Sequence, residues 1–439
     1  MDKVESVFKN KNYVLTFLGA FVSNIAALLL NFATSYYILD ITGNNALYQG
    51  IFLFVCGITF VVVSLFSGVL SDRFNKAKIM YLCDYAKGAV IVGGGFLLLA
   101  FQGNNSAQLV LLFILAVLYN IIAAIFSPAS QSLLPFILKE EQLQQGNGIL
   151  TGMNAFVSIL GAVLGALLYS ILPIYVLMFL IGGCYVASAI SEMFIRYIEE
   201  KKEDKLTIGV VFKELGESFR YLKTKKAILM FCIIALFVNF FFTPLSSNFI
   251  PIFVKTDVAG YENYLLHDVF TPEMWAAVIS ICIGVGTIIG ALALSMRKQM
   301  DKVSKFMKIM FVILAGLIVG CSLLYFFLVD RSNNVNTYLI VFLVIVLLMG
   351  VVISLVNVPL GTVLARNVDK NMLGKVQSLI NIGSQGLTPL ASFLGGLVIQ
   401  SAGNSVLLFG CSAGFILITL VFVLNRTVNE LWNFRNMRI

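Results

Sequence analysis

The sequence predicts an all-α membrane protein, with twelve transmembrane helices in two bundles of six. Of its 439 residues, 59% are hydrophobic and 12% are charged, whereas soluble domains carry about twice that charged fraction. Apolar windows of about 20 residues, the length with which a helix crosses a bilayer, recur along the whole chain. Lysines and arginines gather in alternate connections between these windows. Together these observations exclude a single soluble domain.

Twelve windows are long and apolar enough to be spans. Their limits lie near 13–39, 47–71, 79–101, 107–130, 145–170, 173–195, 227–254, 273–296, 305–329, 337–362, 373–400 and 404–425. An even number of spans places both termini on one side, together with every connection from an even to an odd span. That side holds all but three of the 30 lysines and arginines, the exceptions being Lys87, Lys255 and Arg331. The positive-inside rule therefore predicts that both termini are cytoplasmic.

The two halves of the chain repeat each other. The fifth span carries a polar stripe, and the eleventh span carries one with the same spacing. The first stripe is Asn147, Thr151, Asn154 and Ser158, and the second is Gln377, Asn381, Ser384 and Thr388. A proline closes the span before each stripe, Pro128 and Pro359. We predict a six-helix bundle at 1–195, a cytoplasmic linker with an amphipathic helix at 196–226, and a second bundle at 227–439. Parallel repeats of this kind place a binding site between the bundles, near the bilayer midplane.

The sequence excludes several classes of protein. Seven cysteines lie inside apolar runs without a Cys-x-x-Cys pair, and His267 is the single histidine, so we predict no metal site. No Gly-x-x-x-x-Gly-Lys-[Ser/Thr] loop occurs, which argues against an ATP-driven pump. No nucleophile and base can be assembled around one histidine. The net charge of +8 follows the loops that orient spans. We expect no enzyme activity, no cofactor and no nucleic-acid partner.

A charged motif, "GVLSDRFNKAK", connects the second and third spans. It resembles the Gly-x-x-x-Asp-Arg-x-x-basic-basic loop of the major facilitator superfamily. The segments "MYLCDYAKG", "FSPASQSLLPFILKEEQLQQGNGI" and "FKELGESFRYLKTKKAIL" are similar to the drug-exporter branch of that family, which contains macrolide efflux proteins and a lysophospholipid transporter. The resemblance covers essentially the whole chain. It implies transport by alternating access.

We interpret the charged loop as a cytoplasmic gate that latches helix ends together. Asp72 can accept hydrogen bonds from a helix N-terminus, and Arg73 can make bidentate contacts. Lysines in such a loop also anchor to lipid headgroups. The resembling branch carries an acidic-x-x-basic pair in the third span, which extends the gate. Its predicted residues are Gly68, Asp72, Arg73, Lys76, Lys78, Asp84 and Lys87. The alternatives are a topology signal for the loop and an ordinary ion pair in the span.

Uncharged polar side chains inside the spans predict a central substrate cavity. It comprises Asn24, Asn31, Tyr119, Asn120, Asn154, Ser158, Asn239, Asn357, Asn381, Gln385 and Thr388. Amides and hydroxyls suit an amphipathic, weakly polar or zwitterionic molecule. The alternative is that they are hydrogen-bonding glue between helices. Likewise, Gly161 with Gly165 and Gly286 with Gly290 fit the small-x-x-x-small pattern of close helix packing.

Few acidic side chains lie within the predicted spans, and such residues are candidates for proton binding. Asp40 and Asp84 are our candidate proton carriers, whereas Glu192, at the inner end of span six, is expected at the membrane interface. Tyr119 stands where many drug–proton antiporters of the superfamily carry an arginine.

These patterns predict a secondary transporter that exports an amphipathic, drug- or macrolide-like small molecule, with protons as the candidate coupling ion. Two alternatives stay open: a proton-independent facilitator of lysophospholipids, and a membrane sensor or scaffold that does not transport. We expect a monomer in contact with membrane lipids, because one chain of this kind can complete a transport path. The resemblance implies a multi-pass protein of the plasma membrane, the cytoplasmic membrane of a bacterium.

Overall fold

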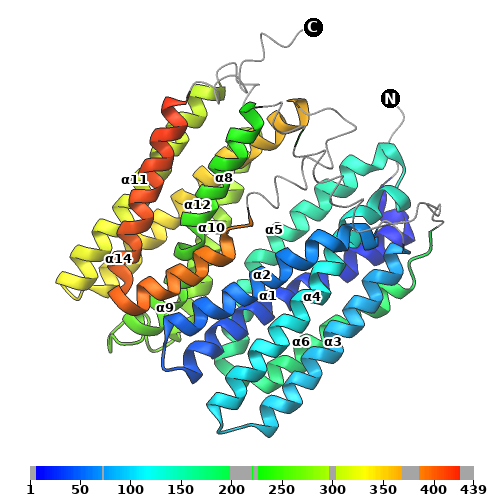
Figure 1. The fold of residues 1–439 in the computed structure, drawn as a ribbon, viewed down its shortest axis with the longest axis horizontal. Helices are drawn as coiled ribbons and strands as arrows, with labels where there is room; N and C mark the ends of the chain where they lie inside the picture. The colour runs from blue at the N-terminus through cyan, green and yellow to red at the C-terminus, as the bar shows by residue number, and fades with distance from the viewer. Residues whose placement is uncertain are drawn as a thin grey trace. The chain divides into compact units, whose positions relative to one another are not determined.

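The computed structural model describes residues 6–71, 74–197, 220, 226–295, 303–367 and 385–425, and this part of the chain is almost entirely helical (Figure 1). Within it, 11 helices are long and apolar enough to cross a membrane. The helical membrane class is therefore confirmed, while the count of twelve spans and the side of the termini stay predictions. Two compact units emerge, residues 1–44 with 55–207, and residues 45–54 with 208–439. The predicted amphipathic linker helix lies outside the described residues, apart from Arg220.

The first unit contains the helices of the N-terminal half. They are η1 (Val7–Lys9), α1 (Lys11–Ile41), α2 (Ala46–Ser71) from Val55 onward, α3 (Lys76–Ala100), α4 (Asn105–Ile137), α5 (Glu140–Ile171) and α6 (Ile174–Met193). Asparagine side chains cap three of these helices by accepting backbone N–H groups of the first turn: Asn10 for α1, Asn75 for α3 and Asn104 for α4. Such caps satisfy donors that a helix start leaves unpaired.

Small residues set the packing of the first unit, in which α3 lies against α4 and α6, and α1 lies against α5 and α6. Gly161 of α5 faces Leu28 of α1, and a Cβ there would lie 2.7 Å from Leu28 Cδ1. One turn later, Gly165 faces Phe32 in the same way. The predicted packing role of this glycine pair is therefore confirmed.

The prolines do not close their spans. Helix α4 continues through Pro128 and Pro135 to Ile137, and α12 (Val335–Asn367) continues through Pro359. A membrane helix tolerates an internal proline when nearby groups satisfy the freed backbone atoms. The prediction that Pro128 and Pro359 end their helices was wrong, and α4 is longer than its apolar window.

The second unit contains the remaining helices. They are α8 (Lys226–Pro244), η2 (Leu245–Phe249), α9 (Ile250–Phe253), η3 (Val254–Val258), α10 (Pro272–Ser295), α11 (Val303–Tyr325), η4 (Phe326–Arg331), α12 and α14 (Thr388–Leu424). The segments η2, η3 and η4 are π-helical, a form that often marks functional sites. Within α14, Gly403 has a φ of 86° and breaks the helix into two stretches. This break lies where the sequence predicts the boundary between the last two spans.

Helices α10 and α12 approach each other through glycines. A Cβ at Gly286 would collide with the Leu347 carbonyl oxygen of α12, and one at Gly350 would collide with the Ile283 carbonyl oxygen of α10. Gly290 meets Val351 in the same way, since a Cβ there would lie 2.5 Å from the Val351 carbonyl oxygen. Only hydrogen at these positions permits such backbone contact. The predicted packing role of Gly286 and Gly290 is confirmed, and Gly350 completes it.

The first residues of α2 belong to the second unit and pack on α14. Gly50 and Gly396 face each other, and a Cβ on Gly396 would lie 2.8 Å from the Cα of Gly50. The Ala46 backbone N–H donates to the Gln400 side-chain oxygen over 3.0 Å. One helix of the N-terminal half therefore contributes its first turns to the core of the other unit.

Candidate functional site

The predicted gate begins where α2 ends. Gly68 lies within α2, while Asp72 and Arg73 lie outside the described residues, so the latch contacts of that pair stay a prediction. Lys78 is exposed on the first turn of α3, and its backbone N–H is bound by the Asn75 cap. This placement suits the predicted contact with lipid headgroups.

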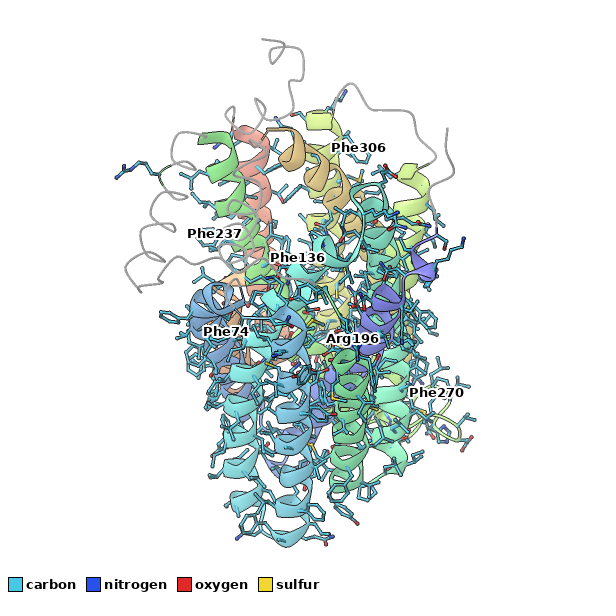
Figure 2. All side chains as sticks on the ribbon, turned by 90° about the vertical axis from the view of Figure 1, so that its right-hand side faces the viewer. Phe74, Phe136, Arg196, Phe237, Phe270 and Phe306 are labelled. Atoms are coloured by element: carbon cyan, nitrogen blue, oxygen red, sulfur yellow. The ribbon has the colours of Figure 1, made fainter. Side chains whose placement is uncertain are left out.

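Lys76 is buried rather than directed to lipid. Its ammonium lies 4.5 Å from the centre of the Phe136 ring of α4, and its backbone N–H donates to the Tyr197 hydroxyl over 2.7 Å. Phe136 and Arg196, the neighbour of Tyr197, lie at the same end of the first unit (Figure 2). An ammonium over an aromatic face is attracted by the ring quadrupole. Lys76 therefore ties the start of α3 to the end of α4.

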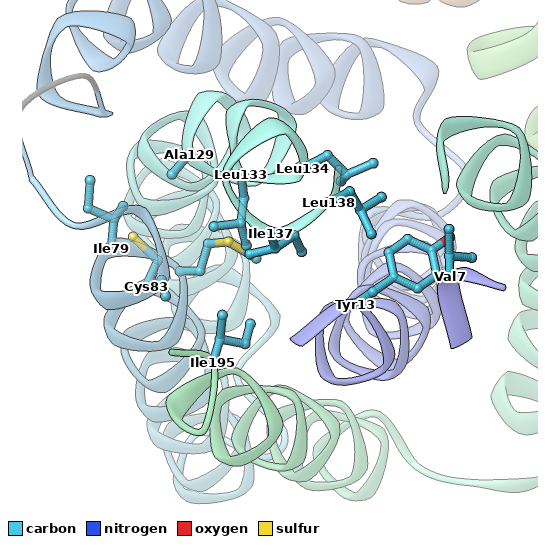
Figure 3. Close-up of a cluster of buried hydrophobic side chains, with 12 residues drawn as sticks. Val7, Tyr13, Ile79, Cys83, Ala129, Leu133, Leu134, Ile137, Leu138 and Ile195 are labelled. Carbon is cyan, nitrogen blue, oxygen red and sulfur yellow. The ribbon is translucent and has the colours of Figure 1, made fainter. Parts of the chain in front are cut away.

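An apolar cluster closes this end of the first unit (Figure 3). It joins η1, α1, α3, α4 and the segment after α6 through Val7, Tyr13, Ala77, Ile79, Met80, Cys83, Ala129, Leu133, Leu134, Ile137, Leu138 and Ile195. The Tyr13 hydroxyl donates to the Gly146 carbonyl of α5 over 3.0 Å, and the Asn12 side chain bonds both backbone groups of Arg196. Packing of these side chains and the two sets of hydrogen bonds hold these helix ends together.

A charged pair lies next to this cluster. The Lys87 ammonium donates to Asp84 Oδ1 over 2.9 Å, and both side chains are almost wholly buried. The ammonium also sits 3.7 Å from the centre of the Phe126 ring of α4. The pair that the sequence assigned to the gate therefore forms, but in the interior between α3 and α4.

Glu192 differs most from its sequence-based expectation. The sequence places it at the membrane interface, yet its side chain is 0% exposed. Within the described residues, neither carboxyl oxygen has a hydrogen-bond partner. Asp84 and Lys87 are the charged side chains that act on it electrostatically. The sequence signal was too weak to find this site, since Glu192 stands at the end of an apolar window.

Tyr119 belongs to the same interior region. Its hydroxyl lies 2.7 Å from the Tyr185 hydroxyl of α6, and both rings are buried. The Lys87 ammonium lies 5.2 Å from the centre of the Tyr185 ring. Although the sequence assigned Tyr119 to a substrate cavity, this hydroxyl pair is part of the packed core of the first unit.

Two predicted cavity residues of the first unit come together. The Asn24 amide of α1 donates to the Asn154 side-chain oxygen of α5 over 2.9 Å. The Ser158 hydroxyl extends this stripe and donates to the Asn154 carbonyl over 2.8 Å. Phe21 and Phe156 stack beside the pair, with ring centres 6.4 Å apart. The result is an exposed polar surface with aromatic rings next to it.

The other predicted cavity residues that the structure describes bond within their own segments or are exposed. The Asn120 and Asn239 amides donate to carbonyls of their own helices, and Thr388 donates to the Gln385 carbonyl. Asn31, Asn357 and Gln385 are exposed, whereas Asn381 lies outside the described residues. Asp40, a candidate proton carrier, is exposed at the end of α1 and accepts a hydrogen bond from Tyr169.

An apolar pocket lies in the second unit. Its lining residues are Phe242, Leu245, Ser246, Phe249, Ile250, Ile283, Ile318, Cys321, Phe342, Val346, Met349 and Leu408. Sequence reasoning followed polar stripes and so missed a pocket built from ordinary apolar residues. The available signal was the density of phenylalanines around η2.

A hydrogen-bonded acid also lies in the second unit. The Tyr325 hydroxyl and the Asn404 amide both donate to Asp257 Oδ2, over 2.9 and 3.0 Å. Nearby, Lys255 and Glu273 form an ion pair of 2.6 Å. These contacts tie η3 to α10, α11 and α14. In the part of the chain that the structure describes, no cluster of His, Cys, Asp and Glu could hold a metal ion.

Comparisons with known proteins agree with this architecture. Residues 16–391 match the sequence profile of the Major Facilitator Superfamily. The uncharacterized MFS-type transporter YkuC of Bacillus subtilis is 23% identical, over 85% of this chain and 82% of its own. Macrolide efflux protein A of Streptococcus pyogenes is 22% identical, over 92% of both chains.

Solved structures share the fold at low identity. A D-xylose-proton symporter has a TM-score of 0.71 at 12% identity, covering 97% of this chain and 99% of its own. A bacterial homologue of the iron transporter ferroportin, in its inward-facing state, has a TM-score of 0.68 at 15% identity, with 95% and 99% covered. At these identities the likeness concerns the fold alone.

Proposed function

This chain belongs to the major facilitator superfamily, and we propose that it exports an amphipathic small molecule by alternating access, coupled to proton entry. The observation that carries the substrate class is the pocket in the second unit, whose lining is aromatic and aliphatic with a single hydroxyl, Ser246. Such a pocket accepts the apolar part of a ligand and offers no counter-charge to a strongly ionic metabolite. The distant similarity to a macrolide efflux protein supports the same class.

The polar part of the substrate requires amide and hydroxyl partners. Exposed Asn154 and Ser158 and half-buried Asn24 offer them in the first unit. We propose that this polar surface provides those partners. We also propose a monomer in the cytoplasmic membrane of a bacterium, with cytoplasmic termini and with Asp72 and Arg73 latching the gate.

A proton-independent facilitator of lysophospholipids is the second candidate. It is favoured by the apolar pocket, which suits an acyl chain, and by Tyr119, an uncharged residue that bonds Tyr185 in the core. A sensor that does not transport is the third candidate. It would leave substrates unmoved in any vesicle.

Inverted membrane vesicles that contain the full chain separate these candidates. Uptake of erythromycin, ethidium and lysophosphatidylcholine is measured with and without a pH gradient. Erythromycin or ethidium uptake that collapses with the gradient supports the proposal. Gradient-independent movement of the lysolipid alone supports the facilitator, and no movement of any probe supports the sensor. Asn24→Leu is expected to reduce uptake, and Asn104→Leu, at the α4 cap away from this surface, serves as the control.

A further inference from the structure

Three ionisable side chains are buried together in the first unit, two acids and one base. Asp84 and Glu192 are 0% exposed and Lys87 is 3% exposed. We propose that Glu192, set beside the Asp84–Lys87 pair, is the proton-binding residue of this transporter. The role of that proton in transport rests on the proposed proton-coupled export, whereas its presence on Glu192 does not.

The charges in this cluster do not balance when both acids are ionised. Lys87 is directly paired with Asp84 at 2.9 Å, so its charge is already compensated. Moving an ionised carboxylate out of water costs several kcal/mol unless partners replace its hydration. Three carboxyl oxygens of the cluster have no hydrogen-bond partner within the described residues. They are both oxygens of Glu192 and Oδ2 of Asp84. One carboxyl of the cluster is therefore more stable with a proton, and Glu192 is the one without a cation of its own.

The position of Glu192 in its helix also favours a neutral carboxyl. It is the penultimate residue of α6, which ends at Met193. The C-terminal end of a helix carries a partial negative charge from its unpaired carbonyls, and this disfavours a second negative charge. A neutral carboxyl avoids that repulsion.

Within the part of the chain that the structure describes, Lys87 is the one cation that acts on Glu192. Helix α1 contributes Gly19, where a Cβ would lie 2.9 Å from Glu192 Cγ, so the backbone of α1 covers the carboxyl arm. Helix α3 contributes Asp84 and Lys87, with the Cys83 thiol also within electrostatic reach of Glu192. Helix α4 contributes the Tyr119 hydroxyl, which bonds a hydroxyl of α6 itself and acts on the Asp84–Lys87 pair.

The apolar cluster supplies the route by which such a proton leaves. Cys83 and Ile195 belong to that cluster, and each is close in sequence to one of the two acids. While the cluster is closed, no water reaches the carboxyl and the O–H bond is kept. When the helix ends separate, water hydrates Glu192, the O–H bond breaks, and the proton passes to the water while the electron pair stays on the carboxylate. This exchange needs no other reactant.

The direct test detects the protonated carboxyl itself. Purified full-length protein in lipid vesicles is titrated while infrared spectroscopy records the C=O stretching band of neutral carboxylic acids. At pH 7 exposed acids are ionised, so a band that remains there reports a buried protonated group. We expect this band in the wild type, its loss in Glu192→Gln, and its retention in the control Glu141→Gln, an exposed acid of α5. A wild type without the band, or Glu192→Gln that keeps it, overturns the proposal.

A second variant guards against misfolding. If Glu192→Gln does not yield folded protein, Glu192→Asp keeps the carboxyl on a shorter arm. A displaced band in that variant supports the assignment, and an unchanged band overturns it.

A transport measurement connects the site to export, with erythromycin as the probe in inverted vesicles. We expect Glu192→Gln to lose the stimulation by a pH gradient while Glu141→Gln keeps it. Equal stimulation in both variants overturns the coupling role and leaves the proposed export intact. A wild type that moves no erythromycin under any gradient refutes the proposed export for this probe, while the infrared band still decides the protonation of Glu192.

Discussion

Replacing Gly286 by alanine tests how α10 meets α12. The added Cβ would collide with the Leu347 carbonyl oxygen and lie 3.1 Å from the Val351 nitrogen. Both are backbone atoms of α12, so no side-chain rotation relieves the contact and the two helices must separate. Overpacking of this kind costs about 1–3 kcal/mol. Against that stands a gain of about 1 kcal/mol, because alanine favours the helix over glycine.

A matched control isolates the steric cost. Gly316 lies in α11, and a Cβ there would have nothing within 4 Å. Gly316→Ala should therefore gain the helix preference of alanine without any steric cost. Its free energy of unfolding should exceed that of Gly286→Ala by about 1–3 kcal/mol. Unfolding in mixed micelles with rising dodecyl sulfate, followed by circular dichroism, measures both values. Equal stabilities of the two variants would refute the close contact between α10 and α12.

Three further variants probe the sites. Lys87→Met leaves the Asp84 carboxylate unpaired, so the free energy of unfolding should fall by about 3–5 kcal/mol; adding Asp84→Asn should restore most of this loss in the same assay. Asn404→Leu removes one hydrogen-bond donor to Asp257, and the free energy of unfolding should fall by about 1–3 kcal/mol. An unchanged free energy of unfolding would show that this hydrogen bond does not stabilise the fold. Ser246→Trp fills the apolar pocket and should weaken equilibrium binding of erythromycin by about tenfold or more, that is 1.4 kcal/mol; unaltered binding would place the ligand elsewhere.

Helices and their order could be predicted from the sequence because apolar windows and loop charges are properties of neighbouring residues. Packing motifs could be predicted from the sequence only in part. The glycine spacing at Gly161 and Gly165 indicates a close approach but not its partner, which the structure identifies as Leu28 and Phe32 of α1. Gly350 has no glycine four residues away, and its role depends on the carbonyl oxygen of Ile283 in another helix. Contacts between distant segments supply that information.

Glu192 shows why burial is harder to predict than helix position. An acid at the end of an apolar window ordinarily lies at the membrane interface, and the sequence offers no reason to think otherwise. Its surroundings come from two other helices. Gly19 of α1 lies against its carboxyl arm, and Asp84 and Lys87 of α3 act on it electrostatically. Neither neighbour is visible in a hydropathy window.

The two units carry different candidate sites, and we propose that they have different roles. The first unit holds charge in its interior, with Glu192 beside the Asp84–Lys87 pair. The second unit carries an apolar pocket whose lining includes no charged residue. A proton site needs a desolvated acid, and a site for the apolar part of a drug needs the opposite. If each unit performs one task, filling the pocket lowers substrate affinity and leaves proton binding intact, whereas neutralising Glu192 removes the proton and leaves affinity intact.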